Sequence, residues 1–314
     1  MKIGLIDVDG HSGFPNLPLM KLSAWHKARG DTVEWYHPFY CNHHMDRVYM
    51  AKVFSFSPDY LEPIDADEVV RGGSGYCIEL VDGKEVYHAE RDHPLPPEVE
   101  HIYPDYSIYN ITDTAYGFMS RGCPRGCDFC HVKDKEGRRA YKVADLSEFW
   151  NGQKNIVLLD PNPIACREWK DILQQLIDSK ACVDFSQGVD IRIMTEEKAE
   201  MLKQVRVKLV HFAFDRFQDW DIVVPRLQKF SEVTGWKRWK VSVYVLCNFD
   251  TTLDQDLQRI YAIRKCGFQP YVMLYDKAHI PRGSVYGRLQ RWCNNPRIFW
   301  KCERFEDYDR KIYG

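Results

Sequence analysis

Three cysteines and a histidine stand close together in the segment SRGCPRGCDFCH at 120–131. Cys123, Cys127 and Cys130 follow a C-x3-C-x2-C spacing, and glycine and proline separate them. One loop of this kind offers three thiolates to a metal ion or to an iron–sulfur cluster. The glycines let the backbone wrap closely around a bound group. The segment therefore predicts a metal or cluster site.

Four kinds of chemistry compete for this segment. Zinc would add His131 to the three cysteines, but structural zinc sites usually collect ligands from two separated knuckles, and one knuckle is obvious here. The run Cys127-Asp-Phe-Cys130-His131 also matches the haem-attachment pattern C-x-x-C-H, which normally needs export. Ordinary buried cysteines are a third alternative, which the intervening glycines and proline disfavour. An iron–sulfur cluster, with one iron left without a protein ligand, is the interpretation we favour.

Composition limits the class of protein. The chain has 314 residues, 45% of them hydrophobic and 28% charged, which is typical of a soluble globular protein with one large or two ordinary domains. The 43 Lys and Arg nearly balance the 45 Asp and Glu, so the net charge gives no strong nucleic-acid signal and no membrane signal. The start, MKIGLIDVDG, predicts a buried strand and no signal peptide. We expect a cytoplasmic protein whose eleven cysteines are mostly reduced, without a disulfide framework.

The elements that position the cysteine segment fall into two groups. Before it, the periodicity predicts a small Rossmann-like α/β layer, with a helix at 17–29 and strands at 2–9, 32–38, 51–57 and 67–73. A proline-rich and acidic stretch at 88–106 follows, and we expect a domain boundary near it. Beyond the cysteines, strands are predicted at 155–160, 181–187, 208–214, 240–246 and 270–275, and helices at 167–179, 195–204, 219–233 and 253–266. This alternation predicts a parallel sheet that forms a closed or partly closed β/α barrel.

Polar side chains follow the carboxyl ends of these predicted strands. In β/α barrels the chemistry lies at that end. The candidates are Asp160, Asn162, Gln187, Asp190, Arg192, Asp215 and Asn248.

The cysteine spacing, with the aromatic Phe129 before the last cysteine, resembles the signature of radical S-adenosylmethionine enzymes. Other stretches are similar to the subset of that family with an N-terminal cobalamin-binding-type domain. They are PNLPLMKLSAWHKARGDTVEWY, ADEVVRGGSGY, YGFMSRG, LLDPNP, DFSQGVDIRIMT, VLCNFDTTLDQDLQRI and GFQPYVMLYD. The similarity covers roughly residues 1–290, and only the cysteine motif is highly specific.

The resemblance implies a cofactor set and a reaction. Cys123, Cys127 and Cys130 would hold a [4Fe-4S] cluster, and S-adenosylmethionine would bind the iron without a protein ligand. Its reductive cleavage would give a 5′-deoxyadenosyl radical that abstracts hydrogen from a substrate. An electron donor such as flavodoxin or ferredoxin is implied. The substrate, whether a small molecule, a peptide or RNA, is not disclosed, and no catalytic side chain is singled out.

The resemblance also implies roles for cofactor-binding side chains. Phe129 would pack near the adenine, or else fill the core. Asp160 and Asn162 would accept the methionyl ammonium. Arg192 would pair with the methionyl carboxylate, the alternative being a surface salt bridge. The weaker candidates, which are equally suited to helix capping or to lining a pocket, are Gln187, Asp190, Asp215 and Asn248.

The expected domains are 1–105, a small Rossmann-like domain of degenerate cobalamin-binding type, 106–285, a radical-SAM β/α barrel, and 286–314, a cap rich in aromatic and basic residues. The cap reading competes with RNA binding by its aromatic and basic side chains, and we favour the cap. The run Asp9-Gly-His11-Ser-Gly13 departs from the D-x-H-x-x-G pattern of histidine-ligated cobalamin, so we do not expect cobalamin. A non-catalytic iron–sulfur or zinc protein, structural or redox-sensing, is the alternative to an enzyme.

Overall fold

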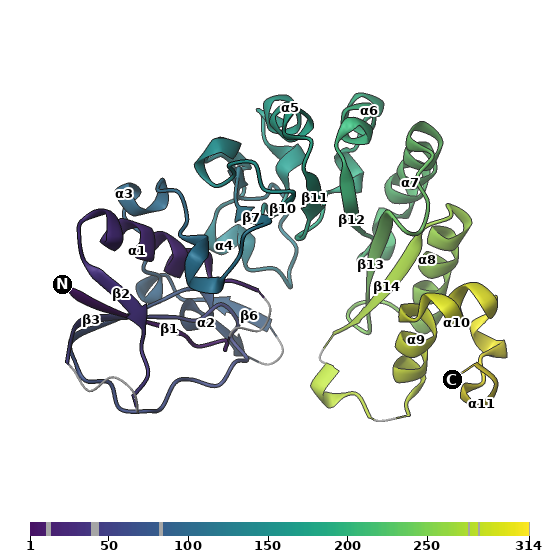
Figure 1. The fold of residues 1–314 in the computed structure, drawn as a ribbon. Helices are drawn as coiled ribbons and strands as arrows, with labels where there is room; N and C mark the ends of the chain where they lie inside the picture. Colours follow the sequence, from purple (N-terminus) through teal and green to yellow (C-terminus); the bar gives the residue numbers. More distant parts are fainter. Residues whose placement is uncertain (11–13, 39–43, 82–83, 276, 282, 314) are drawn as a thin grey trace. The chain divides into compact units, whose positions relative to one another are not determined.

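The computed structural model describes residues 1–10, 14–38, 44–81, 84–275, 277–281 and 283–313. Strands and helices alternate along most of the chain, which makes it an α/β protein (Figure 1). The strands are β1 Lys2–Asp7, β2 Thr32–Trp35, β3 Met45–Ala51, β4 Ala66–Gly72, β5 Ile78–Val81, β6 Lys84–Tyr87, β7 Thr114–Gly117, β8 Ser120–Arg121, β9 Tyr141–Lys142, β10 Asn155–Leu158, β11 Cys182–Phe185, β12 Val207–Ala213, β13 Val241–Cys247 and β14 Gln269–Leu274. The helices are α1 Leu17–Ala28, α2 Ser74–Cys77, α3 Pro97–Glu100, α4 Val132–Lys135, α5 Trp169–Ser179, α6 Glu196–Gln204, α7 Trp220–Thr234, α8 Leu253–Lys265, α9 Val285–Asn294, α10 Pro296–Lys301 and α11 Arg310–Tyr313.

Packing divides the chain into two compact units. The first comprises Met1–Phe118, Gly122–Arg139 and Val143–Ile156, and the second comprises Met119–Arg121, Ala140–Lys142 and Val157–Gly314. The cysteine loop thus belongs to the first unit, and the polar residues after β10 to β13 belong to the second. The functional domain boundaries at 105 and 285 stay a prediction.

The first unit contains a parallel sheet in the order β2-β1-β3-β4. The strands of such a sheet are buried on both faces when helices or loops cover them. On one face Leu5 and Tyr49 pack against Leu19 of α1, and the other face includes Ile6 and Val48. The predicted small α/β layer is therefore present.

The strand predicted at 51–57 is wrong in its position. Strand β3 ends at Ala51, and the following loop is held by the carboxylate of Asp9. That carboxylate accepts hydrogen bonds from the backbone N–H groups of Val53 (2.6 Å) and Phe54 (3.3 Å) and from the Ser57 hydroxyl (2.6 Å). Because the Asp9 side chain satisfies these N–H groups, the segment does not need to pair with a neighbouring strand, despite its alternating apolar pattern.

The larger sheet has the strand order β14-β13-β12-β11-β10-β7. Strands β11 to β14 pair in parallel, and the sheet is open, with β14 and β7 at its edges. Among the residues that the structure describes, these strands therefore do not close into a barrel, and a partly closed barrel stays a prediction. Helices α5 to α8 lie in a row along one side of β11 to β14 (Figure 1), and the four helices predicted in this region are confirmed with small shifts at their ends.

The end of the chain packs on the last strand of this sheet. Helix α9 lies against β14, and α10 against α9. Trp292, Phe299, Phe305 and Tyr308 are buried there. No helix in the part of the chain that the structure describes is long and apolar enough to cross a membrane.

Candidate functional site

The cysteine loop lies between β8 and α4. Cys123, Cys127 and Cys130 are each half-buried. The Cys130 N–H donates to the Cys127 carbonyl oxygen at 3.2 Å, which closes a tight turn between the second and third cysteines. The Cys123 N–H donates to the carbonyl oxygen of Gly137 at 3.2 Å. The loop is therefore held at its start by the segment that follows α4.

Gly122 sets the conformation in which the chain enters this loop. Its φ is +77°, a left-handed value that other residues rarely adopt. A Cβ at this position would overlap the carbonyl oxygen of Arg139. Its N–H donates to the Glu136 carboxylate at 2.9 Å. Glycine is required here because the backbone of the next segment occupies the space of a side chain.

The electrostatic surroundings of the thiols favour the binding of a positively charged metal centre. Burial is the main cause that raises the pKa of Cys130 to about 11; Cys127, Cys123 and Glu85 contribute in the same direction, and a backbone hydrogen bond from Val132 opposes them. Glu85, on β6, accepts a hydrogen bond at 2.6 Å from His131, the residue after Cys130. Thiols that oppose one another's ionisation lose their protons when a metal centre supplies positive charge.

The loop therefore fits a cluster by its donor set and by its backbone. Three thiols and a glycine-shaped entry are what a cubane cluster with one open iron needs. Among the residues that the structure describes, no group of three His, Cys, Asp or Glu side chains is gathered in the way that would hold a single metal ion. Phe129 is half-buried within the same loop.

A lysine after the cysteines joins the loop to its unit, and the sequence analysis missed it. Lys135, in α4, donates to the Cys77 sulfur at 3.3 Å and to the Asp92 carboxylate at 3.3 Å. Cys77 is fully buried, and burial raises its pKa. This contact fixes α4 against α2, so that the loop is held at both ends.

Asp160 is buried at the end of β10, at 2% exposure. Its carboxylate accepts hydrogen bonds from the N–H of Met119 (2.8 Å) and from the N–H and hydroxyl of Ser120 (2.5 Å each). Burial raises the pKa of Asp160 to about 7. The geometry favours a positioning role, in which Asp160 holds the residues that lead into the cysteine loop. Its role toward a methionyl ammonium stays a prediction.

Arg192 and Asp190 lie together after β11. The Arg192 guanidinium donates to Asp190 at 2.8 Å and to Asp219 at 2.8 Å. Asp190 also accepts from the N–H of Arg192 and so caps the short helix at Ile191–Ile193. These carboxylates raise the pKa of Arg192 above its usual value, although burial alone would lower it. The guanidinium is thus fixed at the rim of the sheet.

The other predicted rim residues are placed at strand ends as expected. Asp215, after β12, accepts from the N–H of Leu246 at 3.0 Å, and burial raises its pKa to about 6. Asn162 is buried, at 2%. Gln187 and Asn248 are exposed, and Asn248 has a left-handed φ of +64°. Because β11 to β13 are parallel, the ends that carry these side chains belong to one edge of the sheet.

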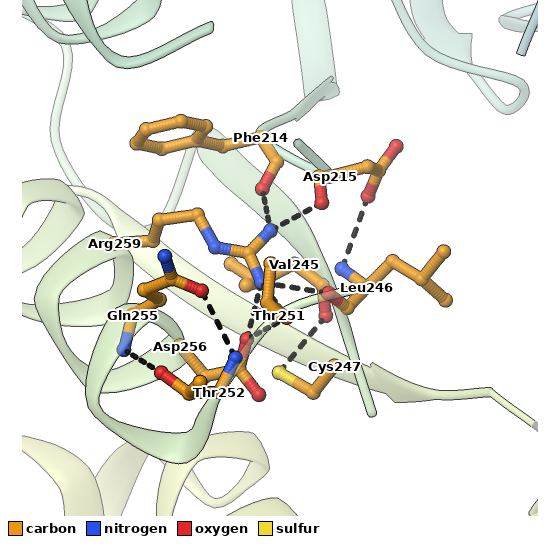
Figure 2. Close-up of polar contacts among 10 residues, drawn as sticks. All are labelled: Phe214, Asp215, Val245, Leu246, Cys247, Thr251, Thr252, Gln255, Asp256 and Arg259. Atoms are coloured by element: carbon orange, nitrogen blue, oxygen red, sulfur yellow. Dashed lines mark hydrogen bonds and ion pairs between the residues drawn. The ribbon is translucent and has the colours of Figure 1, made fainter. Parts of the chain in front are cut away.

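A buried arginine joins two of these strand ends. Arg259, in α8, is fully buried. Its guanidinium donates to the carbonyl oxygens that end β12 and β13, at 2.6 Å to Phe214, 2.5 Å to Asp215 and 2.8 Å to Leu246 (Figure 2). Carbonyl oxygens beyond a strand end have no ladder partner, and this side chain satisfies those of Phe214 and Asp215, which follow β12, while Leu246 lies within β13.

Asp256 neutralises Arg259 inside the protein. The two side chains form an ion pair at 2.5 Å, and both are fully buried. The Thr251 hydroxyl donates to Asp256 at 2.5 Å (Figure 2). The sequence analysis missed this pair. Its signal is an acid and a base three residues apart, next to the apolar positions Leu257 and Ile260 of the predicted helix.

The cysteines outside the loop are buried among apolar neighbours or scattered. Cys247 is fully buried and donates to the Val245 carbonyl oxygen at 3.6 Å. Cys293 and Cys302 are buried as well, and each donates to a carbonyl oxygen. Their surroundings are those of small buried hydrophobic residues.

Comparison with known proteins supports the fold. No protein-family model matches the sequence, and no curated protein matches it. One similar solved structure is that of a radical S-adenosylmethionine methyltransferase, TsrM, from Kitasatospora setae, with cobalamin and a [4Fe-4S] cluster bound. The two chains are 11% identical, with a TM-score of 0.59, and the match covers 87% of this chain and 74% of that one. At this identity the similarity is one of fold.

Proposed function

We propose that the chain is a radical S-adenosylmethionine enzyme. The observation that carries the proposal is the cysteine loop, which contains three half-buried thiols and whose entry Gly122 shapes. The similarity of fold to a radical S-adenosylmethionine methyltransferase supports it. In the proposal Cys123, Cys127 and Cys130 hold a [4Fe-4S] cluster.

In the proposal, the chain's own residues bind the cluster and S-adenosylmethionine and orient them. Once bound and reduced, a cluster would supply one electron for the reductive cleavage of S-adenosylmethionine to methionine and a 5′-deoxyadenosyl radical, which would take hydrogen from the substrate. Gly122 and Glu136 keep the loop in its conformation. Asp160 holds Met119 and Ser120 in place. Arg192, fixed by two carboxylates, is our candidate for the methionyl carboxylate.

For the substrate and the electron donor we propose only the class of molecule. A small molecule, a peptide or RNA would be the substrate, and a flavodoxin or ferredoxin would be the electron donor. Cobalamin, which the similar solved structure contains, is the less favoured further cofactor, because the pattern around His11 departs from the histidine-ligated type. His11 lies outside the described residues.

Iron content tests the cluster. Protein purified without oxygen should carry about four irons per chain, and replacing the three loop cysteines with alanine should remove them. Cys182→Ala is the matched control, because Cys182 is also half-buried but lies on β11. Stoichiometric zinc without iron would refute the cluster.

Cleavage of S-adenosylmethionine tests the activity. The reduced, cluster-loaded protein should form 5′-deoxyadenosine and methionine, at least slowly without substrate. The three-alanine variant should form neither. A loaded cluster that never yields 5′-deoxyadenosine, with candidate substrates and a competent reductant present, would favour a structural or redox-sensing site.

A further inference from the structure

A short turn before β13 exposes aromatic and basic side chains together. The run Lys237-Arg238-Trp239-Lys240 links α7 to β13. Trp239 is 70% exposed, whereas the nearby Trp236 is buried. A tryptophan is usually well covered, since its ring offers a large apolar area. The exposure of Trp239 therefore indicates that this side chain contacts a binding partner.

The backbone holds this turn in place. Helix α7 ends at Gly235, which has a φ of +67°. The N–H of Lys240 donates to the Lys237 carbonyl oxygen at 2.9 Å. Trp236 packs edge-on against Phe230, with the ring centroids 5.7 Å apart. Because the turn is closed and its first tryptophan is anchored in the core, Trp239 is presented on a preformed support.

Further cations adjoin the turn. The Arg238 guanidinium lies 4.7 Å from the ring centre of Trp300, and that of Arg264 lies 5.3 Å from it. A Cβ at Gly267 would lie 3.8 Å from Cδ of Lys237, which places this lysine beside the end of α8. Arg238 of the turn and Arg264 of α8 therefore both contact Trp300, near the end of the chain.

A hollow of about 720 Å³ continues the surface. Its lining includes Arg264, Lys265, Trp300 and Arg304, with Glu303 and Glu306 as opposing charges. Arg304 lies 3.4 Å from Glu306. We call the whole the Trp239 surface, and its cations are Lys237, Arg238, Lys240, Arg264, Lys265 and Arg304.

We infer that the Trp239 surface binds single-stranded nucleic acid. An exposed ring that cations flank in the sequence matches a chain of phosphates whose unpaired bases can stack. A duplex keeps its bases stacked inside, and an acidic protein offers no row of flat rings. The surface lies where β13 begins, whereas the candidate cofactor residues follow strand ends. The inference therefore does not depend on the proposed function.

Binding can be measured on the full chain without cluster or cofactor. A fluorescein-labelled single-stranded oligouridylate of about 12 nucleotides should raise its anisotropy on titration with the protein, and an oligothymidylate should behave alike. With three or four phosphates neutralised, the affinity should fall roughly 20- to 50-fold between 50 and 200 mM salt. A duplex of equal length and polyglutamate are the comparison ligands.

Substitutions separate stacking from charge. Trp239→Ala should weaken binding roughly 5- to 100-fold, and Trp239→Phe should retain most of it. The matched control is Phe56→Ala, because Phe56 is 80% exposed but lies in the other unit. Lys237→Ala with Arg238→Ala should lower the salt slope by about 1.4, whereas Arg167→Ala with Lys170→Ala, at two exposed positions after β10, should leave it unchanged.

Four outcomes would overturn the inference. They are the absence of binding at 50 mM salt, equal affinity for polyglutamate, tighter binding of the duplex, and an affinity that Trp239→Ala does not change. Circular dichroism of each variant would show whether a loss of binding reflects a loss of fold.

Discussion

At the scale of single residues, the cysteine loop depends on a glycine that carries no chemistry. Gly122 and Gly137 both have left-handed backbone angles, with φ of +77° and +92°. A Cβ at Gly137 meets nothing within 4 Å, whereas one at Gly122 meets the Arg139 carbonyl. Substitution at Gly137 therefore tests backbone strain alone, whereas substitution at Gly122 adds a steric clash.

We predict that Gly122→Ala lowers the iron bound per chain much more than Gly137→Ala. The first substitution must displace the entry to Cys123, and the second costs only left-handed strain of about 1 kcal/mol. Iron and protein would be quantified after anaerobic reconstitution of both variants. Equal loading would mean that the entry of the loop adapts, and that its shape does not select the cluster.

Arg192 offers a test of cofactor binding. We expect Arg192→Ala to weaken S-adenosylmethionine binding roughly ten- to a hundredfold, because a charge-assisted contact is worth about 1.5–3 kcal/mol. Iron content should be unchanged. Titration of S-adenosylmethionine into the cluster-loaded variants would measure the affinity, with Arg167→Ala, at an exposed position, as the control. Unchanged affinity in Arg192→Ala would place the carboxylate contact on another residue.

At the scale of elements, α8 does more than cover the sheet, because Arg259 and Asp256 join it to the ends of β12 and β13. We predict that Arg259→Met lowers the free energy of unfolding by about 3–5 kcal/mol, since Asp256 is left as an unpaired buried charge. Adding Asp256→Leu should restore part of the loss. Urea unfolding of the single and double variants measures this.

An exposed ion pair is the control for that prediction. Lys170 and Glu197 pair at 2.5 Å, with about 60% of each side chain exposed. Lys170→Met should change the free energy of unfolding by at most about 0.5 kcal/mol. If Arg259→Met has an equally small effect, the pair would not be what joins the strand ends.

At the scale of the whole molecule, two buried carboxyl groups make stability depend on pH. Burial raises the pKa of Asp160 to about 7 and that of Asp215 to about 6, from 3.8. Between pH 3.8 and these raised pKa values, the native state binds more protons than the unfolded state. The free energy of unfolding contributed by these groups therefore falls as the pH rises from about 4 to 7.

We predict that Asp160→Asn is less stable than the wild type at low pH, because an amide has one acceptor for two N–H donors, and that the gap narrows toward pH 7. Urea unfolding of the cluster-free chain at a series of pH values would show it. A constant gap for Asp160→Asn would mean that its carboxyl ionises normally.

Local sequence determined the elements and the chemistry of one loop. The spacing of Cys123, Cys127 and Cys130 is a property of consecutive residues, and so is the apolar periodicity that predicts α5 to α8. The small α/β layer and the parallel sheet follow from the same alternation. These features need no knowledge of which distant residues meet.

Only the tertiary structure decided how the elements close and what their polar residues contact. The open edges at β14 and β7 depend on which strands pair. Asp160 meets Ser120 across forty positions, and Arg259 meets Phe214 across forty-five. Such contacts depend on strand order and on the side-chain directions of a packed core, and neither leaves a local pattern in the sequence. For the same reason Asp160 could be predicted at a strand end but not as the anchor of Met119 and Ser120.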